Sequence, residues 1–199
     1  MKTNRLLLGL LCICVTLVSC QNSSKDYTAK VEDEIKVPTK EEKIRRGEYL
    51  VMTIGCDHCH TPKKMTDQGP VPDLDRWMMG HPADATLPKI DPSQIGPGKW
   101  LLFHGDLTAA VGPWGISYGA NLTPHETGIG NWSFEQFRKA MTEGKYKGMD
   151  GGRPIMPPMP WQSFKELKGE DLRAIYEYLM SIKPIDNVVP AYTPPDRIQ

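Results

Sequence analysis

The sequence predicts an all-α fold in which a few helices and long loops wrap around one large ligand. Helical periodicity is confined to segments that begin near Thr39, Ser133 and Glu170. Between them, residues 62–131 contain many Gly and Pro and show little periodicity. Irregular stretches of that length are uncommon unless they surround a ligand. The loops are therefore expected to bury their apolar side chains on that ligand.

A covalent haem is the ligand that the motif Cys56-Asp57-His58-Cys59-His60 predicts. Two cysteines three positions apart reach the two adjacent vinyl groups at a porphyrin edge. The histidine after the second cysteine then lies beneath the ring plane, where it ligates the iron. Cys56 and Cys59 are thus the predicted attachment points of one haem c, and His60 is the predicted proximal ligand.

Two other chemistries also use a Cys-x-x-Cys pair. A structural zinc site adds a second pair of ligands, but His81, His104 and His125 occur singly, and we expect them to be ordinary loop residues. A thiol–disulfide exchange site normally opens a helix after a strand, whereas this pair closes a helical segment. Both alternatives fit the sequence less well than a haem does.

Residues 1–19 have the pattern of a lipoprotein signal peptide. Lys2 and Arg5 precede an apolar run of 13 residues, which is too short to span a bilayer. The run ends in Leu17-Val18-Ser19-Cys20, which resembles the lipobox of bacterial lipoproteins. We therefore expect Cys20 to carry lipid as the first residue of the mature chain. An ordinary signal peptide with an incidental cysteine is the alternative.

The rest of the chain divides into a tether and one domain. Residues 20–38 are polar and read as a flexible tether, which leaves residues 39–199 as a single domain. The 24 Lys and Arg residues balance the 24 Asp and Glu residues. Without a basic excess there is no electrostatic footprint for phosphate backbones, so nucleic acid is not an expected partner.

The first predicted helix starts at Thr39 and delivers Cys56 to the haem. Thr39 followed three residues later by Glu42 is a capping box. Gly47 stands in mid-helix, where glycine costs about 1 kcal/mol relative to alanine. A close crossing by the last helix, predicted over Glu170 to about Ile182, would explain that glycine.

The remaining elements have similar signals. Ser133 and Gln136 form a second capping box, and Gly144 ends the helix that follows it. The last helix stops ahead of Pro184. Apolar side chains of the irregular segment are expected to pack as core; they are Trp77, Met78, Met79, Trp100, Leu101, Leu102, Phe103, Trp114 and Tyr118.

The distal iron ligand is predicted in the segment Arg153–Trp161, in which four of nine residues are proline. Proline restricts the backbone, so the segment is expected to be extended and stiff. A thioether held rigidly at the iron loses little entropy on binding, and His/Met ligation raises the reduction potential. Met159, with Pro158 and Pro160 on either side, is the preferred ligand, and Met156 stays open as the alternative.

Four runs of the chain carry a family resemblance: Gly112–Tyr118, Asn121–Pro124, Thr127–Trp132 and Met159–Trp161. They resemble the c-type cytochrome domains of bacterial membrane-bound dehydrogenases and single-haem cytochrome c lipoproteins, over most of residues 40–190. The resemblance implies the class I cytochrome c fold, with crossing terminal helices, His60 proximal and Met159 distal. It also implies a place near the haem for Asn121, Trp132 and Arg153. The dehydrogenase subunits usually carry several haem motifs, whereas this chain has one.

Together these observations lead us to expect a membrane-anchored monohaem cytochrome that transfers electrons as its iron cycles between the ferrous and ferric states. Its partners would be a redox protein donor and acceptor, such as a dehydrogenase or a respiratory complex. It would lie in the bacterial cell envelope, facing the periplasm or the exterior. No catalytic residues are expected, because the chain would not be an enzyme. The alternatives are a haem enzyme or gas-binding sensor with an open sixth coordination site, and a zinc-stabilised binding module.

Overall fold

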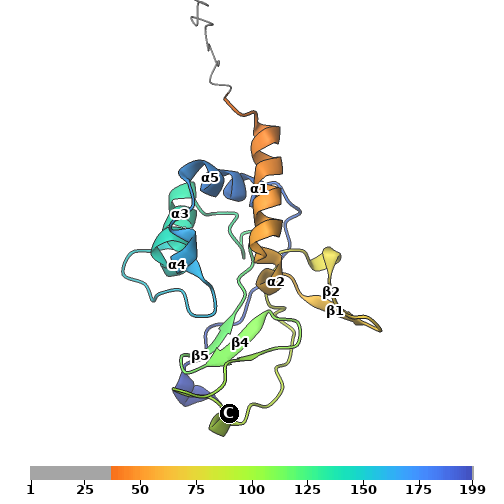
Figure 1. The fold of residues 1–199 in the computed structure, drawn as a ribbon, viewed down its shortest axis with the longest axis vertical. Helices are drawn as coiled ribbons and strands as arrows, with labels where there is room; N and C mark the ends of the chain where they lie inside the picture. The colour runs from red at the N-terminus through yellow and green to blue at the C-terminus, as the bar shows by residue number, and fades with distance from the viewer. Residues whose placement is uncertain (1–36, 199) are drawn as a thin grey trace, which may run out of the picture. The chain divides into compact units, whose positions relative to one another are not determined.

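A computed structural model describes residues 37–198 (Figure 1). The predicted signal peptide, Cys20 and almost all of the tether lie outside the described residues. The helices are α1 (Lys40–Ile54), α2 (Cys56–His60), α3 (Phe134–Glu143), α4 (Trp161–Phe164) and α5 (Gly169–Leu179). The strands are β1 (Lys63–Thr66), β2 (Gly69–Pro72), β3 (Leu102–Phe103), β4 (Ala109–Gly112) and β5 (Gly115–Tyr118). None of the helices in this part of the chain has the length and apolar character that crossing a bilayer requires.

Both predicted capping boxes are confirmed. The Thr39 hydroxyl accepts a hydrogen bond from the Glu42 backbone N–H, and the Glu42 carboxylate accepts one from the Thr39 N–H at 2.8 Å. Ser133 and Gln136 make the same reciprocal pair at the start of α3. Gly144 ends α3 in the left-handed conformation, with φ 65°. Each box satisfies donors that a helix N-terminus otherwise leaves without partners.

The predicted helix crossing at Gly47 is also confirmed. A Cβ placed on Gly47 would lie 2.0 Å from the carbonyl oxygen of Ala174 and 2.7 Å from the Cβ of Tyr178, both on α5. Glycine is therefore required here because the backbones of α1 and α5 are nearly in contact. The buried cluster around this crossing consists of Leu50, Val51, Met78, Ile129, Phe137, Met141, Phe164, Leu172, Ile175, Tyr178 and Leu179.

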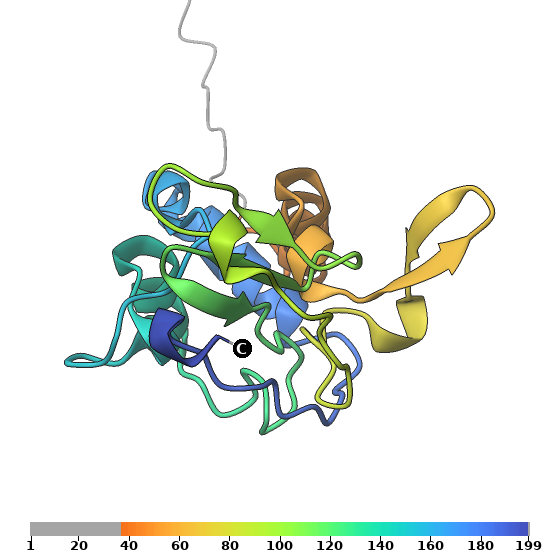
Figure 2. The same cartoon turned by 90° about the horizontal axis from the view of Figure 1, so that it is seen from below.

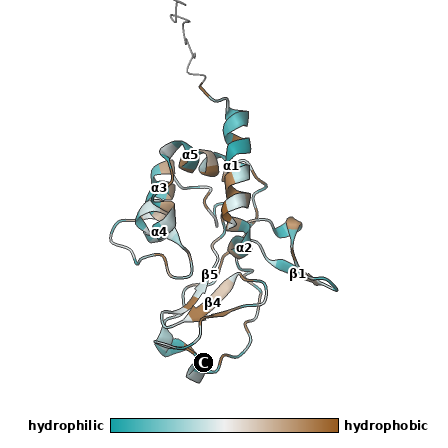
Figure 3. Ribbon diagram, viewed as in Figure 1, coloured by the Kyte–Doolittle hydropathy of each residue, from teal (hydrophilic) through white to brown (hydrophobic). Residues whose placement is uncertain are grey.

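The all-α prediction is wrong for the segment between α2 and α3, which contains two antiparallel sheets. β1 pairs with β2 in a hairpin that projects away from the helices (Figure 2). β3, β4 and β5 form a three-stranded sheet. The strands have at most four residues, and β4 is buried along its whole length and apolar (Figure 3). A short strand buried on both faces does not alternate between apolar and polar residues, so no strand pattern stood out.

The packing predicted for this segment is correct for Met78 and Met79, which are both buried. It is wrong for the run from Trp100 to Phe103, where Trp100 is 67% exposed. These side chains lie at the edge strand β3 and the turn before it. Apolar composition alone therefore did not separate edge residues from core residues.

Two buried asparagines connect the C-terminal segment to the loops. The Asn187 amide donates to the carbonyls of Met79 at 2.7 Å and His81 at 2.9 Å. The Asn121 amide donates to the carbonyl of Ile185 at 2.9 Å. Since buried polar groups must be paired, these bonds fix the loops relative to one another.

Replacing Gly47 with Ala should destabilise the protein although alanine is the better helix former. The new Cβ cannot fit against Ala174, and overpacking of this kind costs about 1–3 kcal/mol. That cost outweighs the helix-propensity gain of about 1 kcal/mol. Urea unfolding of the purified protein measures the change.

The matched control is Gly169→Ala, at the first residue of α5, where a Cβ meets nothing within 4 Å. This variant should be as stable as wild type or slightly more so. If Gly47→Ala matched its stability, the close crossing would be refuted.

Candidate functional site

A glycine turn presents the Cys-x-x-Cys-His motif. Gly55 takes the left-handed conformation, with φ 81°, and ends α1 with a hydrogen bond from its N–H to the carbonyl of Val51. The chain then re-enters a helix at Cys56, so α2 consists of the five motif residues. Cys56 and Cys59 are half-buried free thiols, and His60 is buried. All three predicted haem-binding residues of the motif thus lie on one short helix.

The imidazole of His60 is oriented by a backbone carbonyl. Its Nδ1 lies 2.8 Å from the carbonyl oxygen of Ala120. A carbonyl can only accept, so Nδ1 carries the ring proton and the lone pair of Nε2 is free for a metal. Burial lowers the pKa of His60, which favours the neutral ring that ligates iron.

Closely stacked backbone supports the motif from behind. A Cβ on Gly119 would lie 2.1 Å from the carbonyl oxygen of Cys59, and a Cβ on Gly80 would lie 2.4 Å from that of Gly119. The Gly80 N–H donates to the carbonyl of His60 at 2.9 Å. Two glycines therefore let two loop segments stack against α2, and this stacking brings the Ala120 carbonyl to His60.

Lys63 caps the C-terminal end of α2. Its ammonium donates to the carbonyls of His58 at 2.7 Å, Asp57 at 3.1 Å and Thr61. The Asp57 carbonyl also accepts from the Thr61 N–H at 3.0 Å, whereas the His58 carbonyl belongs to the last turn, whose carbonyls a helix end leaves without intrahelical partners. A cation is favoured at this end by the helix dipole. Burial lowers the pKa of Lys63. The cap holds α2 at the turn that carries Cys59 and His60.

The thiols do not have the character of an exchange site. Burial raises the pKa of Cys56 to about 11 and also raises that of Cys59. Cysteines that exchange disulfides have lowered pKa values, since the thiolate is the reactive form. The structure therefore adds an electrostatic argument against the thiol–disulfide alternative.

The segment with the two candidate methionines is held at several points. The Ile155 N–H donates to the carbonyl of Gly144 at 2.7 Å, the Ser117 hydroxyl donates to the carbonyl of Pro157, and the ring of Trp161 covers Gly144. Its prolines led us to expect an extended segment. The segment is not extended throughout, because it turns at residues 157–158.

Packing distinguishes Met159 from Met156. Both are half-buried, but Met159 packs against the buried apolar cluster, as Cys56 does. Met156 is not among the residues that pack against this cluster. The preference for Met159 as the distal ligand thus gains a packing argument, and the ligand assignment stays a prediction.

The three residues that the resemblance places near the haem differ in their surroundings. Trp132 packs against the same apolar cluster as Met159. Asn121 is buried in the hydrogen bonds that connect the C-terminal segment to the loops. The Arg153 guanidinium stacks 3.6 Å from the ring centre of Tyr146. The contacts of Asn121 and Arg153 indicate that they order loops.

Sequence reasoning missed the groups that orient His60. The Ala120 carbonyl is a backbone group and leaves no signal in the residue type. Gly80 and Gly119 are two of 18 glycines in the chain, so nothing in the sequence marks them. Asn187, whose amide donates to the carbonyls of Met79 and His81, was also missed, because its partners are backbone atoms that no residue type marks.

Two of the three histidines that occur singly in the sequence, and that we expected to be ordinary loop residues, come together in the structure. One ligand atom each of His81, His104 and Asp106 lies within 4.8 Å of the other two, the one such group of three found within residues 37–198. Neither Cys56 nor Cys59 belongs to that group. A zinc site built on the Cys-x-x-Cys pair therefore gains no support.

The residues around α2 fit a covalently attached haem. Two thiols and an imidazole lie on one helical turn, and the imidazole has a free Nε2. Cys56 and Met159 face one apolar cluster, which suits a large apolar ring. A soft thioether, a neutral imidazole and two thiols are the groups that such a cofactor uses.

Comparison with known proteins agrees with this site. No protein-family model matches the chain. The chain is 38% identical over 145 residues to the fructose dehydrogenase cytochrome subunit of Gluconobacter japonicus, covering 72% of this chain and 22% of that protein. It is 30% identical over 138 residues to the gluconate 2-dehydrogenase cytochrome c subunit of Pantoea cypripedii, covering 69% and 22%. It is also 30% identical over 144 residues to the cytochrome c subunit of the quinone alcohol dehydrogenase of Gluconobacter oxydans, covering 71% and 22%.

These matches confirm the resemblance inferred from the sequence. The chain spans about a fifth of the length of the three cytochrome subunits that it matches. The similarity therefore concerns one part of each of those larger proteins.

Replacing Gly119 with Ala should disturb haem attachment. The added Cβ would meet the carbonyl of Cys59, and the displacement should cost about 1–3 kcal/mol of stability. It should also lower the amount of covalent haem per chain, measured by the pyridine haemochrome spectrum. Gly105→Ala is the control, because a Cβ there meets nothing within 4 Å. Equal haem content in the two variants would contradict the stacking argument.

Proposed function

We propose that the chain is a monohaem c-type cytochrome whose function is electron transfer, with one haem bound through Cys56 and Cys59. Its similarity to cytochrome subunits of three dehydrogenases supports electron transfer by a cytochrome c. Those relatives are named as cytochrome subunits, which supports a carrier without catalytic residues. The observation that carries the proposal is the His60 ring, whose Nδ1 is bonded to Ala120 so that Nε2 is left for iron.

In this proposal His60 and Met159 would be the two side chains that hold the haem iron. When bound, the haem supplies an iron that takes up and releases one electron. The Ala120 carbonyl fixes the His60 ring plane and increases the electron donation of Nε2. Met159 lies between two anchored residues, Pro157 and Trp161, and this anchoring would help to hold its sulfur in place with the haem bound. Little rearrangement is then needed as the charge changes.

The surroundings of the site would tune its potential. The apolar cluster against which Cys56 and Met159 pack excludes water from one side. Low polarity disfavours the additional positive charge of the ferric form, and thioether ligation acts in the same direction. Both effects raise the reduction potential, which suits acceptance of electrons from a dehydrogenase.

The proposed partners are a redox protein donor and acceptor, with a dehydrogenase or a respiratory complex as the candidates. Dehydrogenase subunits among the relatives support this choice. Docking would use the edge near Cys56 and Cys59, where both cysteines are half-exposed and His58 is exposed. Electron-transfer encounters need only a small, transient interface.

We propose further that Cys20 anchors the chain by lipid in the bacterial cell envelope, with the haem domain facing the periplasm or the exterior. The basis is the run Leu17-Val18-Ser19-Cys20 after a short apolar segment. Stable anchoring takes more than one acyl chain, because a single chain binds a membrane only marginally. The polar tether would let the domain move between donor and acceptor.

Replacing Met159 with Ala should remove the weak red charge-transfer band that reports sulfur bound to ferric haem, and should lower the reduction potential. Met156→Ala is the matched control and should keep both properties, because Met156 does not pack against the cluster. Optical spectra of the oxidised proteins and a redox titration make the comparison.

Loss of the band only in Met156→Ala would transfer the ligand assignment to that residue. A wild-type protein without the band, whose reduced form binds carbon monoxide, would favour the alternative of an open coordination site. A covalent haem that resists acid–acetone extraction would support attachment at Cys56 and Cys59 in either case.

Replacing Cys20 with Ser should release the protein from membranes. The substitution removes the thiol that carries the lipid, so the chain should move from the membrane fraction to the soluble fraction of a bacterial host. Immunoblots of the two fractions measure this, with Cys14→Ser as a control in the segment expected to be removed. A Cys20→Ser protein that stays in the membrane fraction would contradict the lipid anchor.

A further inference from the structure

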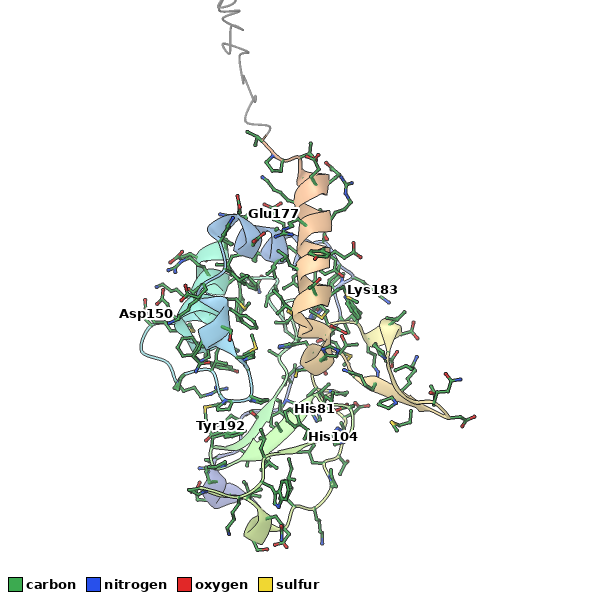
Figure 4. The ribbon with its side chains drawn as sticks, in the orientation of Figure 1. His81, His104, Asp150, Glu177, Lys183 and Tyr192 are labelled. Carbon is green, nitrogen blue, oxygen red and sulfur yellow. The ribbon has the colours of Figure 1, made fainter. Side chains whose placement is uncertain are left out.

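A second cluster of ligating side chains lies outside the haem motif. His81 follows the Gly80 that stacks behind α2, and His104 follows β3 (Figure 4). Asp106 lies in the turn before β4. His81 is fully buried. His104 and Asp106 are partly accessible, with side-chain exposures of 24% and 14%. The cluster therefore extends from the interior to the surface.

Hydrogen bonds determine which ring nitrogen carries the proton in both histidines. His104 Nδ1 lies 2.6 Å from Asp106 Oδ1, and a carboxylate only accepts, so Nδ1 is the donor. The Thr108 hydroxyl donates its single proton to the same oxygen at 2.8 Å. That hydroxyl must therefore accept from His81 Nδ1, which lies 2.7 Å away. Asp106 thus orients both rings, one directly and one through Thr108.

The consequence is that both rings have their free lone pair on Nε2. His81 Nε2 is the one buried side-chain nitrogen or oxygen among residues 37–198 that has no hydrogen-bond partner. An unpartnered buried acceptor is costly and calls for an explanation such as an unseen ion. Burial lowers the pKa of His81, which favours the neutral ring.

The two rings also have a suitable separation. Their centroids are 5.8 Å apart and their planes are 85° apart. Two imidazoles on one tetrahedral ion, with metal–nitrogen distances of about 2.0–2.1 Å, have ring centres roughly 5 Å apart. The observed separation of 5.8 Å is within about 1 Å of that value. His104 also lies in the wall of a cavity of about 310 Å³.

We propose that His81 and His104 bind a divalent transition-metal ion of the zinc type through their Nε2 atoms, with Asp106 as the positioning residue. Imidazole nitrogen suits Zn²⁺, and a carboxylate on the opposite ring nitrogen is the usual arrangement behind a ligating histidine. Solvent fills the remaining positions on the exposed side. Hydrogen bonds from His104 and Thr108 outweigh burial and hold the pKa of Asp106 below its usual range, so this residue stays charged.

The position of the cluster indicates a structural role. The His81 N–H donates to the carbonyl of Gly119 at 2.9 Å, and the next carbonyl along the chain, that of Ala120, orients His60. A metal ion between His81 and His104 would join the loop behind the haem motif to the three-stranded sheet. Zinc bound to the native state should therefore stabilise the protein against unfolding.

The test is titration of the metal-depleted holoprotein with ZnCl₂, followed by calorimetry. Wild type should bind one Zn²⁺ per chain, with a rise in the unfolding temperature. His104→Gln should weaken binding at least tenfold, and Asp106→Asn should weaken it about 10–100-fold, as removal of an outer-shell partner does. X-ray absorption at the zinc edge should show scattering from two imidazoles.

His125→Gln is the matched control, because His125 is a half-buried histidine that bonds Thr127 in another loop. It should bind zinc as wild type does. His81→Gln alters a fully buried residue and could unfold the chain, so the partly exposed His104 carries the test, with haem absorbance as the check of folding. Absence of zinc binding in wild type, or equal binding in wild type, His104→Gln and Asp106→Asn, would overturn the proposal. So would an equal loss in His125→Gln.

Discussion

The hydrogen bond between His60 Nδ1 and the Ala120 carbonyl is the interaction on which the rest of the structure depends. A five-residue helix cannot by itself orient a buried imidazole, because its side chains are free to rotate. The orientation comes from a loop that approaches within van der Waals distance, which is possible only because Gly119 and Gly80 lack a Cβ. Covalent attachment would determine the position of the haem, whereas the hydrogen bond to the Ala120 carbonyl determines the orientation of the His60 imidazole.

The helices and the C-terminal segment hold that contact in place. α1 and α5 cross at Gly47 and form the frame from which α2 extends. Asn187 and Asn121 then fasten the two loops behind α2 to the segment after α5. A chain with a long irregular middle section thus obtains order from buried amides, each of which satisfies carbonyls that no regular sheet or helix pairs.

The same chemical arrangement occurs at two places in the molecule. In His60, and again in His81 and His104, Nδ1 donates a hydrogen bond to an oxygen, so the lone pair of the ring is on Nε2. At the first place the neighbouring thiols indicate a haem, whereas at the second the free Nε2 atoms of two imidazoles are the basis of the proposed zinc-type site. The two places are joined through the backbone of residues 119 and 120, whose carbonyls accept from His81 and His60 respectively.

The sequence by itself determined the local features. Capping boxes at Thr39 and Ser133, the glycine at the helix crossing and the Cys-x-x-Cys-His turn all follow from residues close together in the chain or from one steric requirement. Only the tertiary structure decided the two sheets, the exposure of Trp100, the carbonyl that orients His60 and the meeting of His81 with His104. These depend on contacts between distant segments and on backbone atoms that every residue shares. No pattern in the residue types records them.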